Sequence, residues 1–260
     1  TTGEEVARSA DHSWNPWALA FNADGSVLYS SGWGGTIHRW RIPEMTQIGI
    51  ARGARSNSVV AASPRGGTCA YSDQSGNVRV VDVDSGRESN VFHLPDARYE
   101  YLEYSPDGKL LAAGGTCGRQ IHVAVWQVDE ARLLHRWDWE PGRDPRSAIE
   151  ELRFSLDSKH LAAASFRQSA AHLWDMTTGD AVGRLDHSRV YGLSFTADGS
   201  SLLTAGWDSK IRTWNVRTGD LQGTFEVPKD QEDNDLRMYT VCSEPSGELL
   251  ATAHISRVIR

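Results

Sequence analysis

Six times along the chain, a strand-length run of apolar and aromatic residues leads into a tight polar turn and a second apolar run. The two clearest copies cover residues 17–40 and 190–214, where Asp24 and Asp198 each precede a closing tryptophan by 16 residues. Short runs of this kind, bounded by Gly, Asp or Ser, are typical of β-strands. We therefore expect three antiparallel strands in each copy, with a fourth strand after a further polar turn.

The turns recur at a nearly constant interval. Their fourth residues are spaced 41, 42, 50, 41 and 48 positions apart, and they are Gly25, Gly66, Gly108, Ser158, Gly199 and Gly247. A fixed period of about 40 residues indicates a repeat architecture, in which each copy forms one supersecondary unit. The regular repetition favours one domain, although a chain of 260 residues is long enough for two.

The copies resemble the repeats of the WD-repeat family of β-propellers over nearly the whole chain. The residues that carry the resemblance are the turn Ser105-Pro106-Asp107-Gly108, the pairs Trp174-Asp175 and Trp214-Asn215, and the Thr-Gly-Asp turns that end at Asp180 and Asp220. Each motif alone is weak, but six copies in register are specific. The resemblance implies an all-β fold of four-stranded antiparallel blades around a central channel.

We expect one propeller domain over residues 1–260 with six blades, the last completed by an N-terminal strand near residues 5–9. The expected blades cover residues 14–51, 56–92, 98–137, 148–185, 189–225, and 237–260 with 5–9. Such closure would remove exposed sheet edges. The alternative is an open part of a seven-bladed or longer propeller. Because the chain starts after one closing motif and stops before another, we expect it to be an excerpt of a longer polypeptide.

In the fifth copy, four residues occupy positions at which the family often has a buried chain of hydrogen bonds. They are His187, Thr204, Asp208 and Trp214. The resemblance implies a structural role for this set, although its residue types resemble a hydrolase triad. Other copies depart from the pattern, with Gly34 or Gln168 in place of the Asp and Val81 in place of the Trp. We expect those blades to be held mainly by apolar packing.

Composition limits the classes of function. The chain is 39% hydrophobic and 23% charged, with a net charge of −7, which disfavours non-specific nucleic-acid binding. No apolar run is long enough to span a membrane. Three scattered Cys residues do not suggest a disulfide framework, which weakly favours a cytoplasmic location. We expect no metal, cofactor or catalytic residue, since phosphate-loop, nucleophile-elbow and metal motifs are all missing from the sequence.

A partner is expected on the loop face that holds the segments before each first strand and between each second and third strand. Aligned positions on this face hold Trp33, Trp207, Arg98, Arg119, Arg167, Arg189, Arg237 and His254. Trp and Arg are enriched in binding hot spots. The alternatives are that the tryptophans fold back onto neighbouring blades and that each arginine is solvated or locally paired. Two insertions, 138–146 and the acidic 229–235, extend the same face.

Three functions follow, in descending order of preference. The first is a non-catalytic scaffold that binds a protein or peptide on the Trp and Arg face, and the resemblance implies effector domains in the same polypeptide. The second is a binder of phosphorylated or nucleic-acid ligands through the arginines. The third is a propeller enzyme, which the adjacent pair Glu150-Glu151 does not support, because neighbouring strand residues point to opposite faces.

Overall fold

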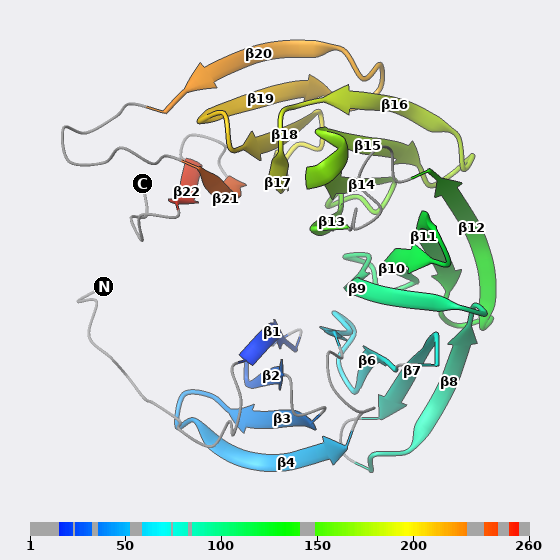
Figure 1. Ribbon diagram of the computed structural model, residues 1–260. Helices are drawn as coiled ribbons and strands as arrows, with labels where there is room; N and C mark the ends of the chain where they lie inside the picture. The colour runs from blue at the N-terminus through cyan, green and yellow to red at the C-terminus, as the bar shows by residue number, and fades with distance from the viewer. Residues whose placement is uncertain are drawn as a thin grey trace. The chain divides into compact units, whose positions relative to one another are not determined.

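The computed structural model describes residues 16–22, 24–32, 36–52, 59–73, 75–82, 85–140, 149–227, 237–243 and 250–254. Within these ranges every regular element is a β-strand, apart from one short 3-10 helix, η1 (Phe166–Gln168) (Figure 1). None of the helical structure described could cross a membrane, because η1 is only three residues long. No three His, Cys, Asp or Glu side chains in these ranges are grouped to hold a metal ion. The all-β fold class predicted from the sequence is confirmed.

The strands form two compact units, residues 1–118 with 124–136, and residues 119–123 with 137–260. The first unit holds two complete four-stranded antiparallel sheets, and a third sheet has residues in both units. Each sheet follows chain order. The strands of these three sheets are β1 (Pro16–Phe21), β2 (Val27–Gly32), β3 (Thr36–Arg41), β4 (Thr46–Arg52), β5 (Val60–Ala62), β6 (Thr68–Ser72), β7 (Asn77–Asp82), β8 (Glu88–His93), β9 (Ala97–Tyr104), β10 (Leu110–Cys117), β11 (Gln120–Gln127) and β12 (Arg132–Trp139).

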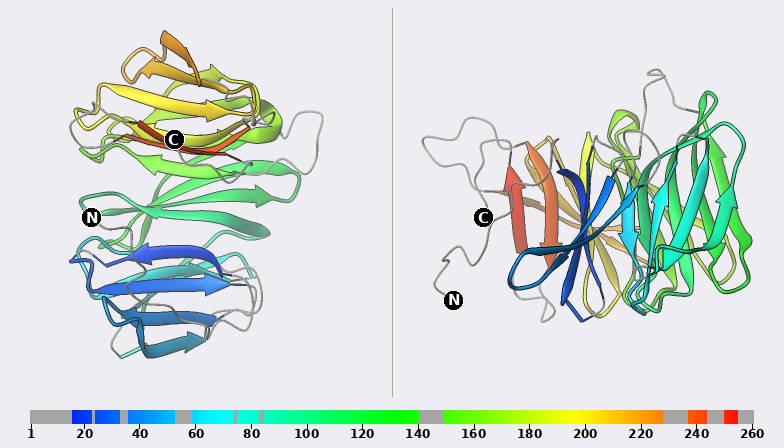
Figure 2. Two further views of the ribbon diagram at one scale, coloured as in Figure 1. Left: turned by 90° about the vertical axis from the view of Figure 1, so that its left-hand side faces the viewer. Right: turned by 90° about the horizontal axis from the view of Figure 1, so that it is seen from below.

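The second unit repeats the same meander twice and adds a strand pair. Strands within each sheet are visibly twisted (Figure 2). The two four-stranded sheets are β13–β16 and β17–β20, and the pair is β21–β22. Their strands are β13 (Glu151–Phe154), β14 (His160–Ser165), β15 (Ala170–Asp175), β16 (Ala181–Asp186), β17 (Val190–Phe195), β18 (Ser201–Gly206), β19 (Lys210–Asn215), β20 (Leu221–Glu226), β21 (Met238–Ser243) and β22 (Leu250–His254).

The repeated turns join the first and second strands through a local hydrogen-bond pattern. In the turn after β9, Asp107 Oδ1 accepts hydrogen bonds from Ser105 Oγ at 2.6 Å and from the Lys109 backbone N–H at 3.0 Å. Gly108 has φ +68°, a conformation that favours glycine. Equivalent bonds to Asp157 and Asp198 fix the turns after β13 and β17. The turn residues thus set which strands pair.

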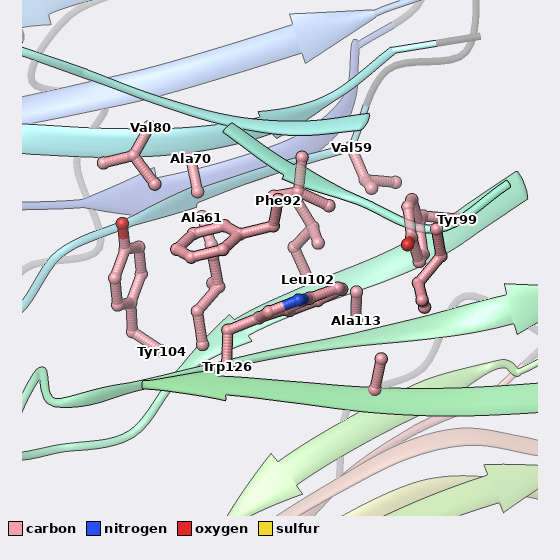
Figure 3. Packing of buried hydrophobic residues seen from close by; sticks show 14 of the residues in the cluster. Val59, Ala61, Ala70, Val80, Phe92, Tyr99, Leu102, Tyr104, Ala113 and Trp126 are labelled. Carbon is pink, nitrogen blue, oxygen red and sulfur yellow. The ribbon is translucent and has the colours of Figure 1, made fainter. Parts of the chain in front are cut away.

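The hydrophobic core lies between the faces of neighbouring sheets. In the first unit, one cluster fills the space between the β5–β8 sheet and β9–β11 (Figure 3). Phe92 stacks on Trp126 with 5.3 Å between ring centroids, and Tyr99 meets the same indole edge-to-face at 6.1 Å. Aromatic pairs of this kind add stability beyond the area that they bury. The closing tryptophans Trp126, Trp174 and Trp214 are therefore core residues.

Some predicted boundaries differ from the observed ones. β12 extends to Trp139, so the first two residues of the predicted insertion, 138–146, belong to a strand. Arg98 was expected just before a first strand, yet β9 begins at Ala97 and Arg98 pairs with Thr116. The last sheet has two strands among the described residues. The N-terminal strand near 5–9, the residues after 254 and the acidic segment 229–235 lie outside the described ranges, so closure of the last blade stays a prediction.

Candidate functional site

A continuous chain of hydrogen bonds crosses the β17–β20 sheet. Trp214 Nε1 donates to Thr204 Oγ1 at 2.9 Å, and the Thr204 hydroxyl lies 2.6 Å from His187 Nδ1. His187 Nε2 lies 3.0 Å from Asp208 Oδ1, and Arg212 donates to Asp208 Oδ2 at 2.9 Å. His187 and Thr204 are buried. The four residues that the sequence placed in one set are thus in contact, in the order Asp, His, Thr and Trp.

The protonation state of this chain follows from its surroundings. Burial lowers the pKa of His187, although the hydrogen bond from its ring to Asp208 opposes this shift. A neutral imidazole can donate Nε2–H to Asp208 and accept the Thr204 hydroxyl at Nδ1, which leaves the Thr204 oxygen free to accept the Trp214 N–H. Burial alone would raise the pKa of Asp208, but its interactions with His187 and Arg212 outweigh burial and lower it. Every member is satisfied within the scaffold.

The β13–β16 sheet has a different polar network, centred on Gln168. Gln168 Oε1 accepts a hydrogen bond from Trp139 Nε1 at 2.7 Å and lies 3.3 Å from His172 Nε2. Gln168 Nε2 donates to the Glu140 carbonyl at 2.6 Å. The Trp139 ring also contacts the His172 ring at 4.6 Å between centroids, with the two planes tilted by 32°. Burial lowers the pKa of His172 to about 4. We expected apolar packing to be the main interaction that holds this blade. That prediction omitted a polar network around Gln168, the residue that stands in place of the Asp of the repeat pattern.

A second set of side chains gathers where β13, β17 and β21 begin. These first strands of successive sheets lie side by side in the second unit (Figure 1). η1, between β14 and β15, and the turn between β18 and β19 reach the same end of the sheets. We call the set the aromatic–arginine cluster, and its members are Phe166, Tyr191, Trp207, Tyr239, Arg167, Arg189 and Arg237.

The four rings of the cluster contact one another. Trp207 meets Phe166 at 4.5 Å between centroids and lies parallel to Tyr191 at 5.9 Å. Tyr239 meets Tyr191 at 5.0 Å and Trp207 at 6.1 Å, both edge-to-face. The indole N–H of Trp207 is buried and finds no hydrogen-bond acceptor in the described part of the chain. Ring contacts from both neighbouring sheets therefore hold Trp207, which is half-buried, while Tyr239 remains 37% exposed.

The three arginines of the cluster lie over the rings. The guanidinium carbon of Arg237 lies 4.7 Å from the centroid of Trp207. That of Arg189 lies 5.6 Å from Trp207 and 5.8 Å from Phe166, and Arg167 lies 5.9 Å from Phe166. Such cation–π contacts contribute about 0.5–1 kcal/mol each at exposed positions. Arg167 and Arg189 are exposed, and Arg237 is half-buried. The arrangement places three positive charges on one aromatic surface.

Two rings and one carboxylate of this region occupy equivalent repeat positions. Tyr191 and Tyr239 are each the second residue of a first strand and sit at a register shift of the strand pair. Glu150, at the same position before β13, forms a hydrogen bond with the Tyr191 hydroxyl. Burial raises the pKa of Glu150, while Tyr191 and Arg167 partly offset that rise. A β-bulge changes the direction in which a side chain points. Glu150, Tyr191 and Tyr239 therefore form one row across three adjacent sheets.

The neighbouring carboxylate has a different role. Glu151 Oε2 accepts the buried backbone N–H of Leu193 at 2.6 Å, and Arg153 pairs with Oε1 at 2.6 Å. Glu151 thus satisfies an edge N–H of the adjacent sheet. Glu150 and Glu151 have separate partners, which is a scaffold arrangement rather than that of a paired acid and base.

The structure brings together four of the residues proposed for partner binding, namely Trp207, Arg167, Arg189 and Arg237. Arg98 in β9 and Arg119 in the turn before β11 are exposed, and neither takes part in the cluster's ring contacts. His254 is the last residue of β22, and Trp33 lies outside the described ranges. Phe166, Tyr191 and Tyr239 were missed. An aromatic residue at the second position of the first strand in copies one, five and six (Trp17, Tyr191, Tyr239) was the available signal.

The family model "WD domain, G-beta repeat" matches residues 3–41 and 179–215. Actin-interacting protein 1 of Drosophila melanogaster is 22% identical over 90% of this chain and 44% of its own length. The guanine nucleotide-binding protein subunit beta of Oryza sativa is 25% identical over 53% of this chain and 37% of its own. Apoptotic protease-activating factor 1 of Mus musculus is 24% identical over 57% of this chain and 11% of its own. The chain thus spans less than half the length of these relatives.

Among solved structures, a chain of the Kuenenia stuttgartiensis hydrazine synthase matches with a TM-score of 0.73 over 94% of this chain and 82% of its own. At 16% sequence identity this likeness concerns the fold alone. The repeated turns, the closing tryptophans, the four-stranded sheets in chain order and the matching family model agree with one another. This chain is therefore similar to the WD-repeat β-propellers, and the WD domain model matches two of its repeats.

Proposed function

We propose that this chain is a non-catalytic protein-binding module whose contact surface is the aromatic–arginine cluster. WD-repeat proteins generally act as scaffolds for protein interaction. What supports the placement is the gathering of four rings and three guanidinium groups from three successive sheets. Tyr191 and Tyr239 lie in strands, and η1 and the turns at the strand ends carry the other members. Aromatic and arginine side chains are the kind that form binding hot spots.

The remaining polar sets favour binding over catalysis. The His187, Thr204 and Asp208 side chains satisfy one another and Trp214 inside the sheet, and His187 has a fully buried side chain. A general base must reach the proton that it abstracts from a substrate. A buried, internally bonded imidazole does not meet that condition, so the set supports the scaffold.

Replacement of Trp207 by alanine tests the placement. Because the indole contacts three other rings and two arginines, Trp207→Ala should reduce the affinity for a bound partner about tenfold or more. The measurement is quantitative affinity capture from an extract of the source organism. Binding of each captured protein, once purified, is then measured directly with the wild-type chain and with the variant.

Phe225→Ala is the matched control, because Phe225 is an aromatic residue of β20 in the same sheet and is 56% exposed. Partners should bind this control as they bind the wild type. Equal binding of every direct partner to the Trp207→Ala chain would remove the cluster from the proposal.

A further inference from the structure

The aromatic–arginine cluster is positively charged on an acidic chain. Arg167, Arg189 and Arg237 lie within it, and the carboxylate of Glu150 forms a hydrogen bond with Tyr191. The chain as a whole has a net charge of −7. A local excess of one sign attracts a ligand segment of the opposite sign, whatever the total charge. The cluster is therefore suited to carboxylates.

The geometry of the arginines supports carboxylate recognition. A guanidinium that stacks on a ring through its flat face keeps its N–H groups at the rim, where two carboxylate oxygens can accept them together. Arg189 lies over two rings, and among the described residues it forms no ion pair. Its neighbours in the described ranges are the rings of Phe166 and Trp207 rather than an acidic side chain.

The backbone at Arg189 adds an independent observation. Arg189 has φ +49°, in the left-handed region that side chains other than those of Gly, Asn and Asp rarely adopt. In the equivalent turn before β9, that conformation is adopted by Asp96, with φ +60°. Backbone preference therefore does not explain an arginine before β17. The position of its side chain over Phe166 and Trp207 explains the arginine instead. Residues with a strained backbone of this kind are found at ligand-binding sites.

We propose that the cluster binds an acidic protein segment, whose Asp or Glu carboxylates accept hydrogen bonds from Arg189 and the neighbouring arginines. An apolar side chain of the same segment packs against the exposed part of Tyr239. This inference rests on the proposed function and specifies its partner. A nucleic acid fits less well, because a long polyanion would extend beyond the cluster onto the rest of a chain with a net charge of −7, and because Glu150 lies beside Tyr191 and Arg167.

Arg189→Gly is the informative variant, because glycine favours the local backbone while the guanidinium is lost. The probe is the tightest-binding member of a random peptide library displayed on phage and selected on the wild-type chain. We expect selected peptides to be rich in Asp and Glu. Arg189→Gly should weaken their binding about tenfold or more, with an unchanged or higher melting temperature, and Arg189→Lys should restore it only in part.

Arg217→Gln is the matched control, since it removes one positive charge from an exposed turn outside the cluster. It should leave the peptide affinity nearly unchanged. Binding of the peptide to the wild-type chain should weaken when the salt concentration is raised from about 50 mM to about 500 mM.

Peptides that need Trp207 but are not acidic, or that bind Arg189→Gly as tightly as wild type, would overturn the inference and leave the proposed function standing. Competition by a single-stranded oligonucleotide that also requires Arg189 would assign the arginines to nucleic acid. If selection yields no Trp207-dependent peptide, both proposals fail.

Discussion

Replacement of Thr204 by valine should lower the free energy of unfolding by about 3 kcal/mol. Valine has nearly the shape of threonine but carries no hydroxyl, so the buried Trp214 N–H loses its acceptor and His187 Nδ1 loses its donor. Each buried polar group left without a partner costs about 1–3 kcal/mol. The measurement is urea unfolding followed by tryptophan fluorescence. The free energies of unfolding of wild type and variant are compared, provided that both depend on urea concentration with the same slope.

Thr213→Val in the next strand is the control. Thr213 is half-buried, and its hydroxyl makes one long hydrogen bond of 3.5 Å to the Gly223 carbonyl. Its replacement should cost less than about 1 kcal/mol. If the two variants unfold at the same urea concentration, the chain from Asp208 to Trp214 does not stabilise the sheet, and its structural interpretation is wrong.

Gly192→Ala should be more damaging still, with a loss of more than about 3 kcal/mol. A Cβ atom at residue 192 would lie 2.7 Å from the Thr240 Cα and 2.8 Å from the Val241 backbone nitrogen. These are backbone atoms of the neighbouring inner strand, so no side-chain rotation relieves the contact. β17 and β21 would have to separate, which would also pull Tyr191 away from Tyr239. Thermal and urea unfolding both measure the effect.

The control for this variant is Gly183→Ala in β16. A Cβ there would meet its nearest atoms at 3.9 Å, an ordinary van der Waals contact. Alanine also loses less backbone entropy on folding than glycine, so Gly183→Ala should be neutral or slightly stabilising. Similar stabilities of the two alanine variants would contradict the close approach of β17 and β21.

The sequence was informative where local chemistry repeats. The Asp-Gly turns and the strand-length apolar runs predicted the first three strands of the first five copies, because such turns close through bonds within a few residues, as at Asp107. The positions of His187, Thr204, Asp208 and Trp214 relative to the turn were equally readable. In both cases the repeat itself supplied the alignment, so few long-range contacts had to be guessed.

Contacts between sheets were much harder to predict. Trp139 was assigned to an insertion, yet it ends β12, where its indole donates a hydrogen bond to Gln168 and contacts the ring of His172 in the next sheet. The rings of Tyr191 and Tyr239 were likewise missed, since their meeting depends on bulges and on the spacing of inner strands. Only the arginines and Trp207 stood out by residue type. The residue types of the surface could therefore be predicted from the sequence, but the contacts between its side chains could not.

The scaffold of the second unit and the proposed binding surface depend on the same strands. Glu151 accepts the Leu193 N–H and Gly192 allows β21 to approach, so the inner strands lie close enough for Glu150, Tyr191 and Tyr239 to form one row. Trp207 and the arginines then pack onto that row. The aromatic–arginine cluster is thus a product of how the sheets pack, and a change in packing should also change binding.

Hydroxyl-radical footprinting of the chain with and without its captured partner tests the location of the binding surface most directly. The partner should suppress oxidation of Trp207 and Tyr239, while Phe225 on the outer strand β20 should be oxidised equally in both samples. Protection that leaves Trp207 and Tyr239 reactive, and falls instead on the turns at 105–109, 155–159 and 196–200, would contradict the proposed location.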